Sequence, residues 1–213
     1  MMNDFTGVKQ IVVGITGASG APYAAKLIKE IIGSGAHVHL VITPFGRRLL
    51  FDELGITEIS SAALIDAASN RLTIYNYKDV GAKIASGSFL TDGMIVCPCS
   101  SNTLAAIAAG LADNLLNRSA AVTLKESRRL ILVPREMPMS RIDLLNALRL
   151  NEAGAIVCPA SPGFYMLPKS VDDLVDFVVG KLLDLLEVPH DLNTRWADQL
   201  ETASQKKPRG PEE

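Results

Sequence analysis

Residues 11–32 read IVVGITGASGAPYAAKLIKEII, and this stretch decides the fold. Its first five residues are apolar and mostly β-branched, which is typical of a buried strand. Gly14 within this run, Gly17 and Gly20 have the spacing GxxGxxG, and apolar residues then recur at helical intervals from residue 21. The stretch therefore predicts a β-strand, a tight glycine-rich turn and an α-helix, which together form the first half of a βαβ unit.

The same unit recurs along the chain. Further short apolar runs at residues 38–42, 94–97, 130–133 and 155–158 are typical of buried parallel strands. Helical patterns cover residues 21–32, 103–116 with part of 117–127, 140–153 and 170–186. The less regular stretch between them indicates helices over 46–54 and 60–68 and an extra strand over 72–77. We expect a three-layer, doubly wound α/β fold of the Rossmann or flavodoxin type, with a mainly parallel sheet.

Composition bounds the function. One domain accounts for residues 1–196, and the polar stretch 197–213 is predicted to be a disordered tail. With 21 Lys and Arg against 23 Asp and Glu, and only 5% aromatic residues, neither nucleic acid nor an anionic membrane is an expected partner. The uncharged stretch 93–111 contains Pro98 and four consecutive polar residues, which argues against a membrane span. Three cysteines cannot all pair, so we expect a reducing compartment, the cytoplasm.

Ligands of such folds bind at the carboxyl ends of the strands. No acidic residue closes the second strand, so the glycine turn disfavours an NAD-type dinucleotide. Its amides either hold a phosphate group or simply permit close packing of the first helix. Residues 97–103 read CPCSSNT, and the hydroxyl groups there cap the next helix or share its amide donors with a phosphate or flavin. Cys97 and Cys99 lack the additional ligands of a metal site and are interpreted as buried small residues.

Charged residues concentrate around the fourth core strand. Arg135 and Glu136 follow that strand directly, on the ligand side, where arginine suits phosphate binding and glutamate suits proton transfer. A surface ion pair between the two is the alternative. Arg128 and Arg129 precede the strand, so we expect them at the opposite edge of the sheet on a solvated face.

Three further patterns in the sequence bear on ligand and metal binding. The proline-stiffened segment 159–165, PASPGFY, presents two aromatic residues after the fifth strand and indicates ligand contact. Residues 172–176 read DDLVD, which matches the DDxxD magnesium motif of prenyl-diphosphate enzymes, but Ser170 followed by acidic residues is better explained as a helix cap. His37, His39 and His190 form neither a catalytic triad nor a zinc-ligand pair in sequence.

Five segments in order resemble the flavin prenyltransferases of the UbiX/Pad1 family. They are ITGASGAPYAAKL (15–27), ASGSF (85–89), CPCSSNTLAAIAAGLADNLLNRSA (97–120), LKESRRLILVPRE (124–136) and ASPGFYMLP (160–168). The third segment is also similar to the wider superfamily of flavin-containing cysteine decarboxylases. A histidine takes part in catalysis by those decarboxylases, and this chain has none between His39 and His190, which favours the prenyltransferase branch.

The resemblance implies a substrate, a donor and a set of contacts. Reduced FMN would be alkylated at N5 and C6 by dimethylallyl monophosphate, without a metal ion, and the product, prenylated FMN, would pass to a UbiD-like decarboxylase. The implied FMN contacts are Gly17, Ala18, Ser19, Thr43, Ser100, Ser101, Asn102, Thr103 and Arg135. The implied contacts to the allylic phosphate are Lys125, Arg135, Tyr165 and Lys181.

Catalytic roles are implied for four residues. Ser19 would move a proton near N5, Glu136 would exchange a proton between phosphate and flavin, Glu53 would shape the prenyl site, and Lys125 would neutralise the leaving phosphate. Supporting positions are Arg118, Ser86 and Trp196.

The resemblance also implies a homo-oligomer, a dodecamer, which the apolar stretch 104–116 and the positive mean hydropathy of +0.22 support in the sequence. Two positions depart from the family: Lys181 stands where many members carry Arg, and Val80 where some carry Trp. An FMN carrier without catalysis and an FMN-dependent cysteine-type decarboxylase are the alternative functions.

Overall fold

The computed structural model contains one sheet of six parallel strands and confirms the predicted α/β class. It describes residues 7–192 and residue 194. The strands are β1 (Gln10–Ile15), β2 (His37–Ile42), β3 (Leu72–Tyr75), β4 (Gly93–Cys99), β5 (Leu130–Pro134) and β6 (Ile156–Val157). They lie side by side in the order β3-β2-β1-β4-β5-β6, which is the Rossmann strand order.

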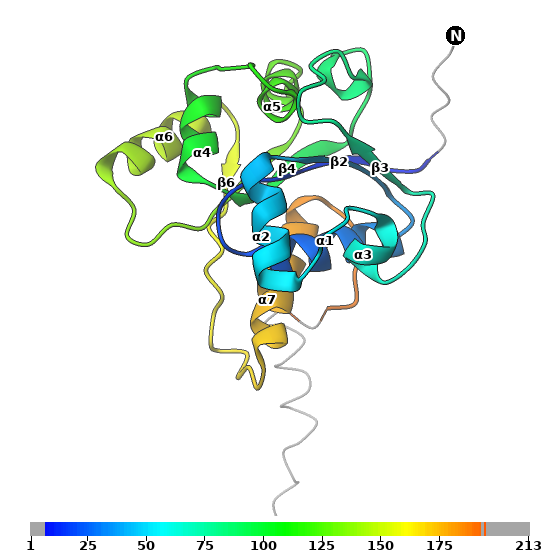
Figure 1. Cartoon of the computed structure of the whole chain (residues 1–213). Coiled ribbons are helices and arrows are strands. Elements are labelled where there is room, and N and C mark those ends of the chain that lie inside the picture. The colour runs from blue at the N-terminus through cyan, green and yellow to red at the C-terminus, as the bar shows by residue number, and fades with distance from the viewer. Residues whose placement is uncertain (1–6, 193, 195–213) are drawn as a thin grey trace, which may run out of the picture.

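Helices cover both faces of the sheet, which makes the fold three-layered as predicted (Figure 1). They are α1 (Ala21–Gly33), α2 (Pro44–Leu54), α3 (Ser61–Ile65), α4 (Ser101–Ala108), α5 (Leu115–Lys125), α6 (Arg141–Glu152) and α7 (Val171–Leu185), with a 3₁₀ turn η1 (Lys83–Ala85). One face packs on α1, α3 and α7, and the other on α4, α5 and α6.

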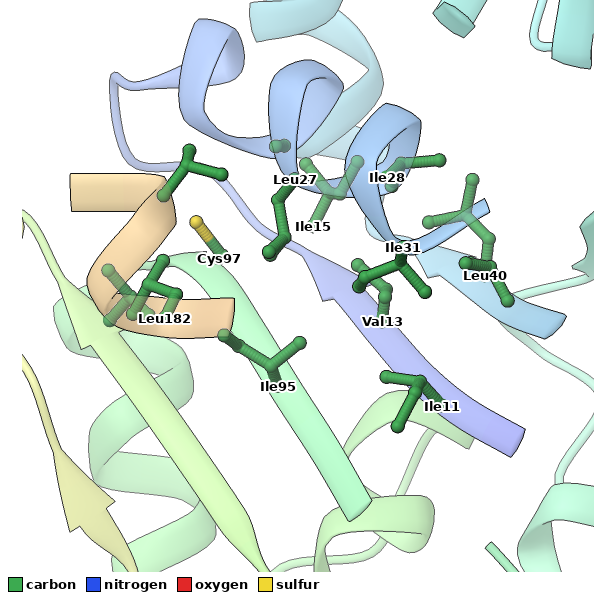
Figure 2. Close-up of a cluster of buried hydrophobic side chains, with 14 of the residues drawn as sticks. Ile11, Val13, Ile15, Leu27, Ile28, Ile31, Leu40, Ile95, Cys97 and Leu182 are labelled. Atoms are coloured by element: carbon green, nitrogen blue, oxygen red, sulfur yellow. The ribbon is translucent and has the colours of Figure 1, made fainter. Parts of the chain in front are cut away.

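Strand β1 shows why the sheet has two cores. Ile11, Val13 and Ile15 point to the α1 side, whereas Val12 joins the core on the α5 side. Figure 2 shows the first set packed against α1 and α7 residues such as Leu27 and Leu182. Burying each large aliphatic side chain contributes roughly 1.5–3 kcal/mol, so a strand buried on both faces reads as a continuous apolar run.

Some expected elements end elsewhere than predicted. The helix expected over 103–116 is wrong in its extent, because α4 ends at Ala108 and α5 begins at Leu115. Gly110 adopts a left-handed conformation (φ 74°), and the side chain of Asn114 caps α5 by accepting from the Asn117 amide at 3.0 Å. Both residues favour a break that apolar periodicity alone does not reveal. The predicted tail 197–213 lies outside the described residues.

The centre of the sheet positions the functional loops. β1 and β4 are neighbours, but α1 leaves β1 toward one face and α4 leaves β4 toward the other. Such a topological switch point is where open α/β sheets bind ligands, at the carboxyl ends of the strands. We call residues 16–20, 100–103 and 135–136, which follow β1, β4 and β5, the switch-point loops. Within the described ranges, no helix is both long enough and apolar enough to cross a membrane.

Candidate active site

The turn after β1 is held by Thr16, a residue that the sequence analysis did not single out. Its hydroxyl donates to the carbonyl of Pro98 (2.8 Å) and accepts from the amide of Ser100 (2.7 Å). Thr16 is fully buried, whereas Gly17 and Ser19 beside it are exposed. The turn therefore presents Ser19 to solvent from a base that is bonded to the end of β4.

Helix α2 packs directly against this turn. A Cβ atom on Gly17 would lie only 2.6 Å from the Cβ atom of Phe45, so the close approach requires glycine. Thr43 is the N-cap of α2, and its hydroxyl accepts from the amide of Gly46 (3.0 Å). The predicted flavin contacts of the turn and Thr43 thus meet at the ends of β1 and β2, beside the exposed ring of Phe45.

Glu53 reaches the start of α1 from the far end of α2. Its carboxylate accepts from the amides of Gly20 (3.0 Å) and Ala21 (2.8 Å), and Gly20 provides no side-chain cap of its own. The helix dipole favours a carboxylate at this position. Because Glu53 occupies both amides, a phosphate at this edge of the sheet would need other donors.

The start of α4 offers such donors. Ser100 is the N-cap, and its hydroxyl accepts from the amide of Thr103 (3.3 Å) and donates to the Thr103 hydroxyl (3.1 Å). The Ser101 hydroxyl donates to Oε2 of Glu136 (3.1 Å), and Asn102 is exposed. First-turn amides have no acceptor within a helix, so the predicted capping leaves amides at this end for a ligand.

Arg135 and Glu136 adjoin these loops but do not pair with each other in the described structure. Nε of Arg135 is buried and has no hydrogen-bond partner among the described residues, whereas Glu136 is exposed. Burial raises the pKa of Tyr23, and the positive charge of Arg135 opposes this rise, so the guanidinium lies near the first turn of α1. The surface ion pair considered from the sequence is therefore absent between these two residues.

This arrangement fits an anionic flavin. A buried donor without a partner is rare in folded proteins and marks a position where a ligand completes the hydrogen bonding. Arg135 supplies that donor, α4 supplies amides, and Gly17 lets α2 pack close to the turn that presents the exposed Ser19. FMN would be held by these residues, with its phosphate near donors that favour negative charge.

Tyr165 and Lys181 lie on the α7 side of the fold. The Tyr165 ring is half exposed, covers Gly163 and packs edge-to-face on Phe177 with 5.5 Å between the ring centroids. Burial raises the pKa of Cys158, and the positive charge of Lys181 opposes that rise, so Lys181 lies near the end of β6. Tyr165 can approach a ligand from the loop after β6 and Lys181 from α7, while Trp196 lies outside the described residues.

A second group of predicted site residues lies apart from the switch-point loops. Helix α5 runs antiparallel to β4, so Lys125 at its end lies beside the amino end of β5. Lys125 pairs with Glu126 (Nζ to Oε1, 3.1 Å). Nε of Arg118 donates to the carbonyl of Ala85 (3.2 Å). The hydroxyls of Ser86 and Ser88 are 2.8 Å apart. We call residues 85–89 with Arg118, Lys125, Glu126 and Arg128 the amino-side cluster. One chain alone does not bring Lys125 and Ser86 to Ser19.

The DDxxD pattern is a helix cap, as the sequence favoured. Asp173 accepts from the amides of Lys169 (2.7 Å) and Ser170 (3.0 Å), and Asp176 pairs with Lys26 (3.1 Å). These hydrogen bonds lower the pKa of Asp173 below its usual range. Among the described residues, no group of three or more His, Cys, Asp or Glu side chains is arranged to hold a metal ion.

Fold and site together define an α/β flavoprotein. The Flavoprotein family model matches residues 3–183. The flavin prenyltransferase UbiX of Halalkalibacterium halodurans is 48% identical over 196 residues, covering 90% of this chain and 95% of that protein. The UbiX of Thermoplasma acidophilum is 49% identical over 189 residues, covering 88% and 99%. The chain therefore belongs to the UbiX family of flavin prenyltransferases.

Solved structures agree with this assignment. A crystal structure of AnUbiX (PadA1) in complex with FMN and dimethylallyl pyrophosphate superimposes with a TM-score of 0.79 at 40% identity, covering 89% of this chain and 97% of that chain. A structure described as a dodecameric FMN-dependent UbiX-like decarboxylase, from Escherichia coli O157:H7, gives the same TM-score at 43% identity, covering 88% of this chain and 98% of that chain. A PPC decarboxylase with a TM-score of 0.57 at 19% identity shares the fold alone.

Proposed function

We propose that this chain transfers a dimethylallyl group from dimethylallyl monophosphate to N5 and C6 of reduced FMN. The observation that carries the proposal is the buried, unpartnered Nε of Arg135 next to exposed Glu136, at the switch point of a chain of the UbiX family. FMN, when bound, supplies the nucleophilic atoms that accept the allylic group. A cation beside the leaving phosphate and a carboxylate that can carry a proton are the two protein groups that such a substitution needs.

Each switch-point residue then has a distinct task. Arg135 binds phosphate and stabilises the charge that develops as the allylic bond breaks. Glu136, held by the Ser101 hydroxyl at 3.1 Å, receives a proton at its carboxylate. Glu53 fixes the start of α1 and thereby the exposed hydroxyl of Ser19. Tyr165 and Lys181 meet the phosphate from the loop after β6 and from α7.

Lys125, Arg118 and Ser86 serve the site of a second copy of the chain. Because Lys125 lies beside the amino end of β5, another copy must bring it to the switch-point loops, and Arg118 and Ser86 belong to the same cluster through residues 85–89. The predicted interface stretch 104–116 gives this assembly little support, since Leu104, Ile107, Leu115 and Leu116 are buried in the chain's own core and Leu111 alone of its large apolar residues is exposed (51%). An apolar stripe on α6 does support it: Ile142, Leu144, Leu145 and Leu148 are 69%, 56%, 53% and 53% exposed. A dodecamer, as in the Escherichia coli relative, is the assembly we propose.

The assay for the activity is a mass measurement. Incubation with reduced FMN and dimethylallyl monophosphate should add one C5 unit to the flavin, and parallel incubation with the pyrophosphate identifies the preferred donor. Glu136→Gln should lose turnover by about 100-fold or more and still bind FMN. A wild-type protein that binds FMN without any gain in flavin mass would instead be a carrier, and release of carbon dioxide from a cysteine-type thiol would indicate a decarboxylase.

Subunit mixing tests the shared site. Arg135→Ala and Lys125→Ala should each be inactive, and joint refolding of the two variants should restore part of the activity, because mixed neighbours contain some sites with both wild-type residues. Continued inactivity of assembled mixtures would contradict the second-copy role of Lys125. We further propose that the product passes to a UbiD-like decarboxylase and that this takes place in the cytoplasm. The three free cysteines support a reducing compartment such as the cytoplasm.

A further inference from the structure

The base of the proposed flavin site is a single buried hydroxyl. β1 and β4 pair from Ile11 with Gly93 up to Gly14 with Val96, and the regular register stops there. Beyond this point the segments that follow β1 and β4 turn to opposite faces of the sheet, toward α1 and α4. Something other than the strand ladder must therefore fix the distance between the loop after β1 and the loop after β4.

Thr16 provides this connection with three hydrogen bonds. Its amide and its hydroxyl both donate to the carbonyl of Pro98, at 3.2 Å and 2.8 Å. Its hydroxyl oxygen accepts from the amide of Ser100 at 2.7 Å. Because one hydroxyl both donates and accepts, its orientation is fixed from both sides.

The positions of these partners matter for the ligand. Gly17, Ala18 and Ser19 follow Thr16 directly in the chain, and Ser100 is the N-cap from which α4 starts. Thr16 has 0% exposure, so water cannot replace its hydrogen bonds if the hydroxyl is removed. The partly buried Ser100 amide would then lose its acceptor, and the start of α4 would shift relative to the turn after β1.

We propose that Thr16 is a positioning residue that sets the spacing between the two loops that bind the flavin. The proposal rests on the proposed function for the identity of the ligand. Thr16 acts through the Ser100 amide and the Pro98 carbonyl and touches no reacting atom. Its loss should therefore weaken FMN binding, while Tyr165 and Lys181, which lie on other segments, still bind the prenyl phosphate.

The test compares variants of two buried threonines. Thr16→Val keeps the shape of the side chain and removes the hydroxyl, and Thr16→Ser keeps the hydroxyl and removes the methyl group. Thr123→Val is the matched control, since Thr123 is 3% exposed and its hydroxyl donates to the carbonyl of Ser119 (2.8 Å) within α5. The dissociation constant for FMN is measured by quenching of flavin fluorescence, together with the denaturation midpoint of each variant.

Thr16→Val should raise the dissociation constant for FMN by about tenfold or more, which corresponds to about 1.4 kcal/mol. Thr16→Ser and Thr123→Val should stay within about threefold of the wild type, as small changes in packing would allow. At saturating FMN, the KM for dimethylallyl monophosphate should be the same in all four proteins. Equal FMN affinity in Thr16→Val and the wild type would overturn the proposal.

Two further outcomes are decisive. Should Thr16→Val fail to fold, Thr16→Ser carries the test, because a tenfold loss of FMN affinity in a variant that keeps the hydroxyl would refute the role of that hydroxyl. If the wild type binds FMN but adds no C5 unit, the proposed function fails while the comparison of FMN affinities still decides the role of Thr16.

Discussion

The switch-point loops and the amino-side cluster both contain arginine and glutamate, but the arginine of the loops lacks a hydrogen-bond partner for Nε among the described residues, whereas that of the cluster is bonded within its own chain. In the loops, Nε of Arg135 is buried without a partner in the described chain, and Glu136 is exposed. In the cluster, Arg128 donates to the carbonyls of Gly87 (2.6 Å) and Phe89 (2.8 Å). The difference separates charges that await a ligand from charges that already stabilise the fold of their own chain.

Replacing one arginine in each region should give the largest effects, on FMN affinity in one case and on stability in the other. Arg135→Leu should raise the FMN dissociation constant by about 100-fold, because it removes the charged donor proposed to hold FMN, and should leave the free energy of unfolding unchanged or higher. Arg128→Leu should lower that free energy by about 2–4 kcal/mol by leaving two carbonyls unpaired. Urea denaturation measures the free energy of unfolding, and flavin fluorescence measures the FMN dissociation constant. If both variants lost stability and FMN affinity to the same extent, the two regions would not differ in the way described.

Acid should destabilise the segment that carries the amino-side cluster. His39 donates from Nε2 to Oε1 of Gln10 (2.9 Å), accepts at Nδ1 from the Tyr75 hydroxyl (3.0 Å), and meets the Phe89 ring edge-on. Burial, aided by His37 and Lys83, lowers the pKa of His39 from 6.5 to about 3. Between these pH values only the unfolded chain binds the proton, so the stability present above pH 6.5 falls as the pH falls.

The size of this acid effect follows from the pKa change. A few kcal/mol should be lost between about pH 6.5 and pH 3, at 1.36 kcal/mol per pKa unit. Denaturation midpoints across that range measure it, with His39→Gln as the control that should show a weaker dependence on pH. An equally steep loss in His39→Gln would assign the effect to other groups.

The fold was predictable because the four central strands, β1, β2, β4 and β5, are buried on both faces. Each core strand reads as a short apolar run, and its flanking glycines and prolines mark the ends, so the layers and the parallel sheet follow from the sequence. The split of residues 103–116 into α4 and α5 was not predicted. The left-handed Gly110 favours the end of α4, and the Asn114 cap favours the start of α5. The apolar pattern continues through the break and therefore does not reveal it.

The site was predictable only in part, for a geometric reason. Arg135 and Ser19 follow strands, so topology places them at one edge. The phosphate-binding role of Lys125 was inferred from the family resemblance alone. Like Arg128, Lys125 precedes β5 and so lies at the other edge of the sheet. Thr16 and Phe45 were missed, since a hydrogen bond to Pro98 or a contact with Gly17 depends on packing that spacing along the chain does not encode.

Two glycines test how tightly the switch-point loops are packed. Gly17→Ala would place a Cβ atom 2.6 Å from the Cβ atom of Phe45, so α2 must shift, at a cost of about 1–3 kcal/mol in the free energy of unfolding. Gly33→Ala, at the end of α1, meets nothing within 4 Å and should stabilise by about 0.4–1 kcal/mol. Thermal denaturation compares them, and similar melting temperatures would mean that the turn yields more easily than its contacts imply.

Lys125→Met should have the smallest effect on stability. Its 3.1 Å pair with Glu126 is exposed on the lysine side (58%), and such pairs contribute about 0–1 kcal/mol, less at high salt. Chemical denaturation in low and high salt measures the change, and a loss well above 1 kcal/mol would show that the chain needs this lysine for its own fold. If stability is unaffected while the KM for dimethylallyl monophosphate rises, Lys125 is used outside its own chain, and the two regions compared above are halves of one site.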